Sequence, residues 1–117
     1  MRRDRFAELL AVLQSEEAEV NQTKGEEYSG PDDALANFKR ISGQLAARGM
    51  NVSPELVCMV YLQKHLDSIY SYVAGRGKPS EPIRGRIVDA RLYLALLYAL
   101  IVERESSGVS TFDRDEP

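Results

Sequence analysis

The sequence predicts an all-α fold, a bundle of four helices, and three observations support that prediction. Apolar residues recur at three- and four-residue steps in four segments, which is the period of a helix with one buried face. No segment alternates polar and apolar residues as a strand does, and no Asn-Gly or Asp-Gly hairpin turn occurs. The connections between these segments are short, which favours antiparallel neighbours in a bundle.

The first two helices are expected over residues 4–21 and 32–48. The first carries an apolar stripe that begins at Phe6. The second follows Pro31 and two acids, which suit the positive end of a helix dipole, and Gly49 marks its end. The ten residues between these helices are expected to form a loop.

The last two helices are expected over residues 53–74 and 80–105. The third begins at the Ser53-Pro54 pair, an N-cap residue followed by proline at the first helical position. Gly75 follows its last apolar residue, and Gly108 follows the fourth helix. The sequence therefore predicts helix ends at glycines in both cases.

The fourth helix is apolar on nearly every side over residues 92–102. Such a helix is buried on most faces, and three neighbours in so small a subunit would hardly cover it. We therefore expect a homo-oligomer built in part on this helix. The domain is expected to span residues 1–105, and the polar, acidic residues 106–117 are expected to form a disordered tail.

Composition limits the class of protein. The chain has 117 residues, 44% of them hydrophobic and 28% charged, which is ordinary for one globular domain. One cysteine forms no internal disulfide, and no apolar stretch follows the first residues, so we expect a cytoplasmic protein. The net charge of −3 argues against a duplex nucleic-acid partner. The longest apolar run is too short to span a membrane.

An acidic pair near the end of the first helix is a candidate metal site. Glu16 and Glu19 are three residues apart, so both carboxylates leave the same side of the helix. Carboxylate oxygens are ligands that Mg²⁺ prefers. The alternative is a solvated acidic face.

The connection after the first helix is a candidate phosphate site. Residues 24–30 place Lys24 and Tyr28 among glycines, so an amine, backbone amides and an aromatic ring could contact a nucleotide. The alternative is a plain turn between helices. On the third helix, Lys64 is a candidate phosphate contact, and His65 next to it is either a ligand contact or a structural residue.

The entry of the fourth helix combines cations with one acid. Arg86, Asp89 and Tyr93 fall on one stripe by helical spacing, and Arg84 lies nearby. Asp89 among apolar neighbours needs a partner, which is either Arg86 or a ligand or metal ion. A local basic patch on an acidic chain suits a small anion. The patch consists of Arg76, Lys78, Arg84, Arg86 and Arg91.

These residues together resemble the MazG-like all-α nucleoside triphosphate pyrophosphohydrolases. The resemblance covers about residues 16–103 and is nearest to the small phage-type branch that is described as nucleotide-modification-associated. It rests on the order of Lys24, Tyr28 and Gly30, then Asn37-Phe38, then Lys64-His65, then Glu81, Asp89 and Tyr93.

The resemblance implies Mg²⁺ held by two pairs of carboxylates. Glu16 and Glu19 would supply the first pair, and Glu81 and Asp89 belong to the second. That second pair is incomplete, because Gly85 stands where the family spacing places a carboxylate. The metal-ligand set that the resemblance implies is therefore Glu16, Glu19, Glu81 and Asp89.

Three interpretations follow. The first is a nucleotide-binding protein that resembles Mg²⁺-dependent nucleotide diphosphohydrolases, in which a metal-activated water would attack a phosphate. The second is a non-catalytic viral protein that binds and sequesters a nucleotide or cyclic-nucleotide signal, with arginines in place of metal. The third is a structural oligomeric bundle. The residues expected at the nucleotide are Lys24, Tyr28, Lys64, His65, Arg84, Arg86 and Tyr93.

Overall fold

A computed structural model of the chain describes residues 1–76 and 82–108, and the regular structure within them is entirely helical. Four long helices pack together in this part of the chain, which confirms the predicted all-α class. In chain order, the elements are α1 (Arg3–Val20), the π-helical turn η1 (Asn21–Gly25), α2 (Glu26–Ser29), α3 (Ala36–Ala46), α4 (Pro54–Val73) and α5 (Ile83–Ser106).

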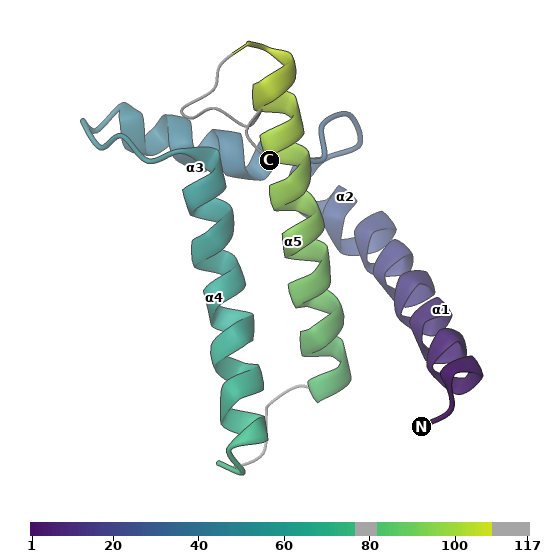
Figure 1. The fold of residues 1–117 in the computed structure, drawn as a ribbon. Helices are drawn as coiled ribbons and strands as arrows, with labels where there is room; N and C mark the ends of the chain where they lie inside the picture. The colour runs from purple at the N-terminus through teal and green to yellow at the C-terminus, as the bar shows by residue number, and fades with distance from the viewer. Residues whose placement is uncertain (77–81, 109–117) are drawn as a thin grey trace.

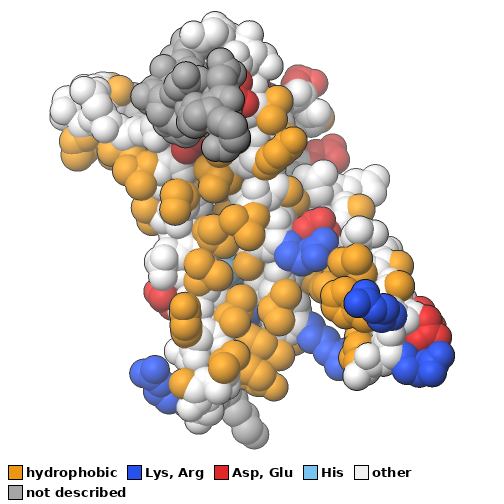
Figure 2. Space-filling model, viewed as in Figure 1, with side chains coloured by type: hydrophobic (Ala, Val, Ile, Leu, Met, Phe, Trp, Pro, Cys, Tyr) orange, Lys and Arg blue, Asp and Glu red, His pale blue; other side chains and the backbone are white. Residues whose placement is uncertain are grey.

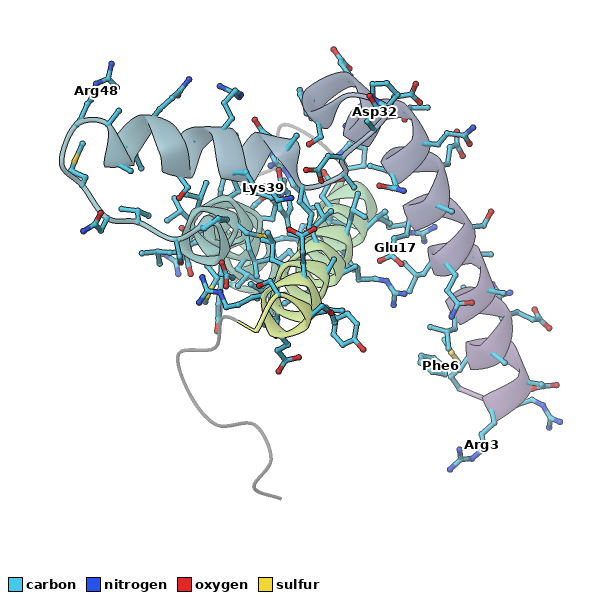
Figure 3. All side chains as sticks on the ribbon, turned by 90° about the horizontal axis from the view of Figure 1, so that it is seen from above. Arg3, Phe6, Glu17, Asp32, Lys39 and Arg48 are labelled. Atoms are coloured by element: carbon cyan, nitrogen blue, oxygen red, sulfur yellow. The ribbon has the colours of Figure 1, made fainter. Side chains whose placement is uncertain are left out.

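Helices α4 and α5 form the centre of the fold. They lie side by side along most of their length, and α3 crosses them near one end (Figure 1). Helix α1 packs against α5 and the turn η1. Seen from above, α3 and the η1–α2 connection lie on the same side of the α4–α5 pair (Figure 3).

The predicted ends of α4 are confirmed. The Ser53 hydroxyl oxygen accepts a hydrogen bond from the Leu56 N–H at 3.1 Å, and Pro54 occupies the first turn. Gly75 follows the helix with φ of 73°, the left-handed backbone that glycine adopts without steric cost.

The connection between α1 and α3 was expected to be a loop, and that prediction was wrong. The chain continues through η1 and α2 to Ser29, because no proline interrupts it and Gly25 is accommodated in the π-helical turn. Gly30 then ends the helix. Helix α3 begins at Ala36, four residues later than expected, because the Asp33 carboxylate accepts a hydrogen bond from the Leu35 N–H at 2.9 Å.

The hydrophobic core lies where α3, α4 and α5 meet. Two ion-pair systems frame it: Lys39 of α3 contacts both Asp33 and Glu103 at 2.8 Å, and Arg104 of α5 contacts Glu55 of α4 at 2.7 Å. The buried members of the core are Leu35, Phe38, Val57, Cys58 and Leu100.

Helix α1 contributes no buried residue. Its C-terminal half is joined to α5 by the ion pair between Glu17 and Arg91, at 3.2 Å, and its N-terminal half diverges from α5 (Figure 1). Phe6, the first residue of its apolar stripe, is 59% exposed.

Residues 92–102 are less buried than their composition suggests. Leu100 is buried, whereas Leu94 and Tyr98 are 52% and 71% exposed. Among the described residues, no helix combines the length and hydropathy needed to cross a membrane. Most of the expected tail, residues 109–117, lies outside the described part of the chain.

Candidate functional site

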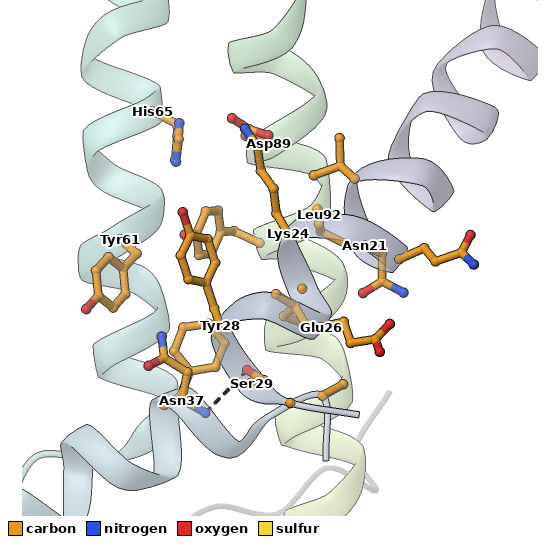
Figure 4. Close-up of a pocket in the computed structure, with 18 of the residues that line it drawn as sticks. Asn21, Lys24, Glu26, Tyr28, Ser29, Asn37, Tyr61, His65, Asp89 and Leu92 are labelled. Carbon is orange, nitrogen blue, oxygen red and sulfur yellow. Dashed lines mark hydrogen bonds between the residues drawn. The ribbon is translucent and has the colours of Figure 1, made fainter. Parts of the chain in front are cut away.

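A pocket of about 640 Å³ opens between the η1–α2 connection, the start of α3, and helices α4 and α5. Ligand pockets for molecules of nucleotide size have volumes of this order. Figure 4 shows how the elements converge: Lys24 and Tyr28 come from η1 and α2, Tyr61 and His65 from α4, and Asp89 from α5.

Aromatic rings from α3, α4 and α5 form one wall of the pocket. The Tyr61 and Tyr93 rings are stacked, with centroids 6.2 Å apart and planes 19° apart. Phe38 lies 6.1 Å from Tyr61 and 6.3 Å from Tyr93. The His65 imidazole is 5.1 Å from the Tyr93 ring. A wall of this kind presents flat apolar faces on which a planar ring can stack.

The hydrophobic core fixes this wall in place. Phe38 is buried in the core, and Tyr93 packs against the same cluster. The backbone carbonyl of Tyr93 accepts a hydrogen bond from the Cys58 thiol at 3.4 Å. Burial, followed by the nearby carboxylate of Asp89, raises the pKa of the Tyr93 hydroxyl, so this group stays protonated at neutral pH.

Positive charge surrounds the other side of the pocket. Lys24 from η1, Lys64 from α4 and Arg86 from α5 all line it, against the two acids Glu26 and Asp89. Three cations from three elements surround a space that is also bounded by aromatic rings. Such an arrangement matches an anion that carries a planar ring system.

A second hollow of about 420 Å³ lies between the end of α1 and the start of α5. Its lining includes the three acids Glu16, Glu19 and Asp89. Two residues, Lys24 and Asp89, line both this hollow and the larger pocket. Within residues 1–76 and 82–108, no three His, Cys, Asp or Glu side chains lie close enough to hold a metal ion. Glu81, the remaining residue of the expected metal set, lies outside the described residues.

The structure brings most of the expected nucleotide contacts together. Lys24, Tyr28, Lys64, His65, Arg86 and Tyr93 all line the larger pocket. Arg84 lines neither hollow and is exposed, because two residues along a helix turn its side chain about 200° away from Arg86. The expected phosphate cradle of backbone amides is not formed, since residues 24–29 are helical.

Several residues of the pocket were not among the predicted site residues, and Tyr61 and Asn37 are two of them. Tyr61 precedes His65 by four residues, so its position on the pocket face of α4 follows from the helical period. Asn37 also lines the pocket, and its backbone N–H donates a hydrogen bond to the Ser29 hydroxyl at 3.4 Å (Figure 4). No sequence signal predicts this contact between α2 and α3.

Comparison of the chain with protein-family models, curated proteins and solved structures finds no match. The MazG-like resemblance therefore stays a prediction, and the interpretation of the site depends on its own geometry.

Proposed function

We propose that the chain binds a nucleotide in the larger pocket. One observation carries the proposal: a stacked aromatic wall and three cations from different elements line the same space of about 640 Å³. The base stacks on the wall formed by Tyr61 and Tyr93, and the phosphates lie towards Lys24, Lys64 and Arg86. The resemblance to MazG-like proteins, which the sequence suggests, agrees with this class of ligand.

Each part of the pocket has a chemical role in the proposal. Stacking of a base on an aromatic side chain contributes about 1–3 kcal/mol and tolerates different bases. Arg86 offers a guanidinium fork to phosphate oxygens, whereas Lys24 and Lys64 act as point charges. Tyr28 is 64% exposed and lines the pocket, at a position where it can cover a bound base.

A divalent cation is not required for this mode of binding, because the three cations neutralise phosphate charge themselves. Mg²⁺ in nucleotide sites is held by one or two carboxylates together with phosphate oxygens and water. The oxygen donors Glu16, Glu19 and Asp89 have suitable chemistry, but in the described residues they do not form a three-ligand cluster.

Hydrolysis of the bound nucleotide is the second candidate function. The observation that favours it is the shared hollow of Glu16, Glu19 and Asp89, which adjoins the larger pocket through Lys24 and Asp89. In this version Mg²⁺ would supply an activated water, and the carboxylates would hold the ion.

The test is calorimetric titration of the chain with a panel of nucleoside mono-, di- and triphosphates and cyclic nucleotides, with Mg²⁺ and with EDTA. Inorganic triphosphate, which lacks a base, serves as the control ligand. We expect at least one nucleotide to bind in EDTA and to bind more tightly than triphosphate. Mg²⁺-dependent release of phosphate or pyrophosphate would select the hydrolase. Failure of every nucleotide to bind contradicts both versions.

Association between copies of the chain is a separate proposal. The two proposals concern different surfaces of the chain and are tested by separate measurements.

A further inference from the structure

The α4–α5 pair has two faces: described elements cover one, and the other is bordered by α1, which is joined to α5 through Glu17 and Arg91. Helix α3 and the η1–α2 connection lie on one side of the pair, where the pocket opens (Figure 3). Nine residues of an α-helix make about two and a half turns, so side chains nine apart point in opposite directions. Tyr70 therefore lies opposite Tyr61 on α4, and Tyr98 lies opposite Asp89 on α5.

The uncovered side is apolar. Figure 2 shows hydrophobic side chains gathered over α4 and α5 on the face turned towards the viewer. We call this surface the open face. Its exposed members are Met59 (51%), Tyr70 (72%) and Val73 (77%) of α4, with Ile87 (38%), Leu94 (52%) and Tyr98 (71%) of α5.

The open face carries little charge at its centre. On α5, between Ile87 and Tyr98, Asp89 lines the pocket. Arg91 is seven residues before Tyr98 and so lies on nearly the same side of α5, at the border of the open face with α1, where it is paired with Glu17. On α4, between Met59 and Val73, Lys64 belongs to the pocket, and Asp67 accepts a hydrogen bond from Gln63. A partner for this surface must be recognised by apolar shape.

The exposed area matches one half of a protein interface. From their exposed fractions, the six side chains present on the order of 700 Å², and a standard interface buries about 800 Å² on each partner. The largest apolar patch on a typical monomer is about 300–600 Å². The open face is therefore comparable in area to the largest apolar patches on monomers and to one half of a standard interface.

We propose that the open face binds the open face of a second copy of the chain, in a two-fold dimer. Two α4–α5 pairs that meet in this way form a four-helix arrangement, which encloses the apolar residues of the open face on all four helices. The two-fold contact is self-complementary, because an apolar surface with little charge at its centre meets an identical surface. Both nucleotide pockets open on the outer sides of this arrangement, so each remains accessible in the dimer.

Sedimentation equilibrium of the ligand-free chain tests the proposal. We expect the parent chain to have twice the monomer mass of 13.1 kDa at micromolar concentrations. Tyr98→Glu and Tyr70→Glu each place a carboxylate on the open face, and each raises the dimer dissociation constant by more than about tenfold. Far-UV circular dichroism checks that both variants keep their helix content.

Val60→Glu is the matched control. Val60 is also on α4 and is 64% exposed, but it is 100° away from Met59 around the helix and lines neither hollow. This variant should remain a dimer. A parent chain that stays monomeric across micromolar concentrations overturns the proposal. An oligomer whose mass neither tyrosine substitution changes also overturns it, because its interface must then lie elsewhere. These outcomes are independent of nucleotide binding.

Discussion

Cys58 is the most completely buried residue of the core, with no exposed surface. Burial raises the pKa of its thiol to about 11, because a thiolate would lose its hydration. We predict that iodoacetamide does not modify the folded chain at pH 8, whereas it modifies the chain in denaturant. Rapid modification under native conditions, read by mass spectrometry, would contradict this packing.

The same thiol makes stability depend on pH in a defined window. The unfolded thiol ionises near pH 8.5, whereas the folded thiol stays neutral to about pH 11, so the unfolded state is favoured as pH rises between these values. We therefore predict that the urea midpoint falls less between pH 8 and pH 10.5 in Cys58→Ala than in the parent. Equal falls in the two proteins would show that Cys58 does not cause the loss.

Asp89 distinguishes the two candidate functions, because it lines both hollows. If the cations alone hold the phosphates, Asp89→Asn changes nucleotide affinity by the same factor in Mg²⁺ and in EDTA. Calorimetry under both conditions measures this. A variant that loses only the Mg²⁺-dependent part of binding or turnover, with an unchanged circular dichroism spectrum, would instead support the hydrolase.

How far a sequence predicts single site residues depends on the helical period. Lys64 and Arg86 reach one pocket because their helices lie side by side, and spacing along each helix gave the correct face. Arg84 was grouped with Arg86 on charge alone, and the same spacing places it outside the pocket. The hydrogen bond between Asn37 and Ser29 depends on how α3 packs against α2, and no local sequence pattern predicts that packing.

Among the elements, the η1–α2 connection departs most from the sequence-based prediction. Glycines at both ends of residues 25–30 suggested a loop, but a glycine inside a helix is tolerated when no other breaker accompanies it. Gly30, by contrast, has φ of 80° and ψ of 179°, a region of backbone space that is essentially restricted to glycine. Of the two glycines, only Gly30 ends the helix, and the chain changes direction there, after α2.

Gly30→Ala tests that assignment. We predict that it lowers the free energy of unfolding by about 1–3 kcal/mol, since alanine is strained at this backbone conformation, and that it weakens nucleotide binding. Gly43→Ala is the control, because Gly43 lies within α3 and nothing lies within 4 Å of an added Cβ atom. That variant should gain about 0.5–1 kcal/mol. Urea denaturation measures both, and equal stability of the two variants would contradict the assignment.

Helix α1 is the least firmly attached of the long helices. It has no buried residue, and the ion pair between Glu17 and Arg91 joins its C-terminal half to α5. We predict that backbone amides of α1 exchange with deuterium much faster than those of α4, because local opening of α1 disrupts little packing. Glu17→Gln should increase exchange in α1 and leave α4 unchanged. Protection of α1 equal to that of α4 would contradict the weak attachment.

For the molecule as a whole, the sequence predicted the class of fold better than its arrangement. Four apolar stripes with glycine or serine at their ends were enough to predict four long helices that pack together. The crossing of α3 over α4 and α5 was not predictable, because it follows from how Leu35 and Phe38 fit the core. The apolar composition of residues 92–102 predicted an interface between copies of the chain, and two exposed residues of this segment, Leu94 and Tyr98, belong to the proposed dimer interface.

The central claim is that nucleotide phosphates bind at the cations of the larger pocket. The most direct measurement is calorimetric titration of the parent, Arg86→Ala and Arg84→Ala with the nucleotide that binds the parent most tightly. Both arginines lie on α5, but only Arg86 lines the pocket. We predict a loss of about 1–3 kcal/mol, or roughly 5- to 150-fold in affinity, for Arg86→Ala, and unchanged affinity for Arg84→Ala. Unchanged affinity for Arg86→Ala, or an equal loss in the two variants, would contradict the claim.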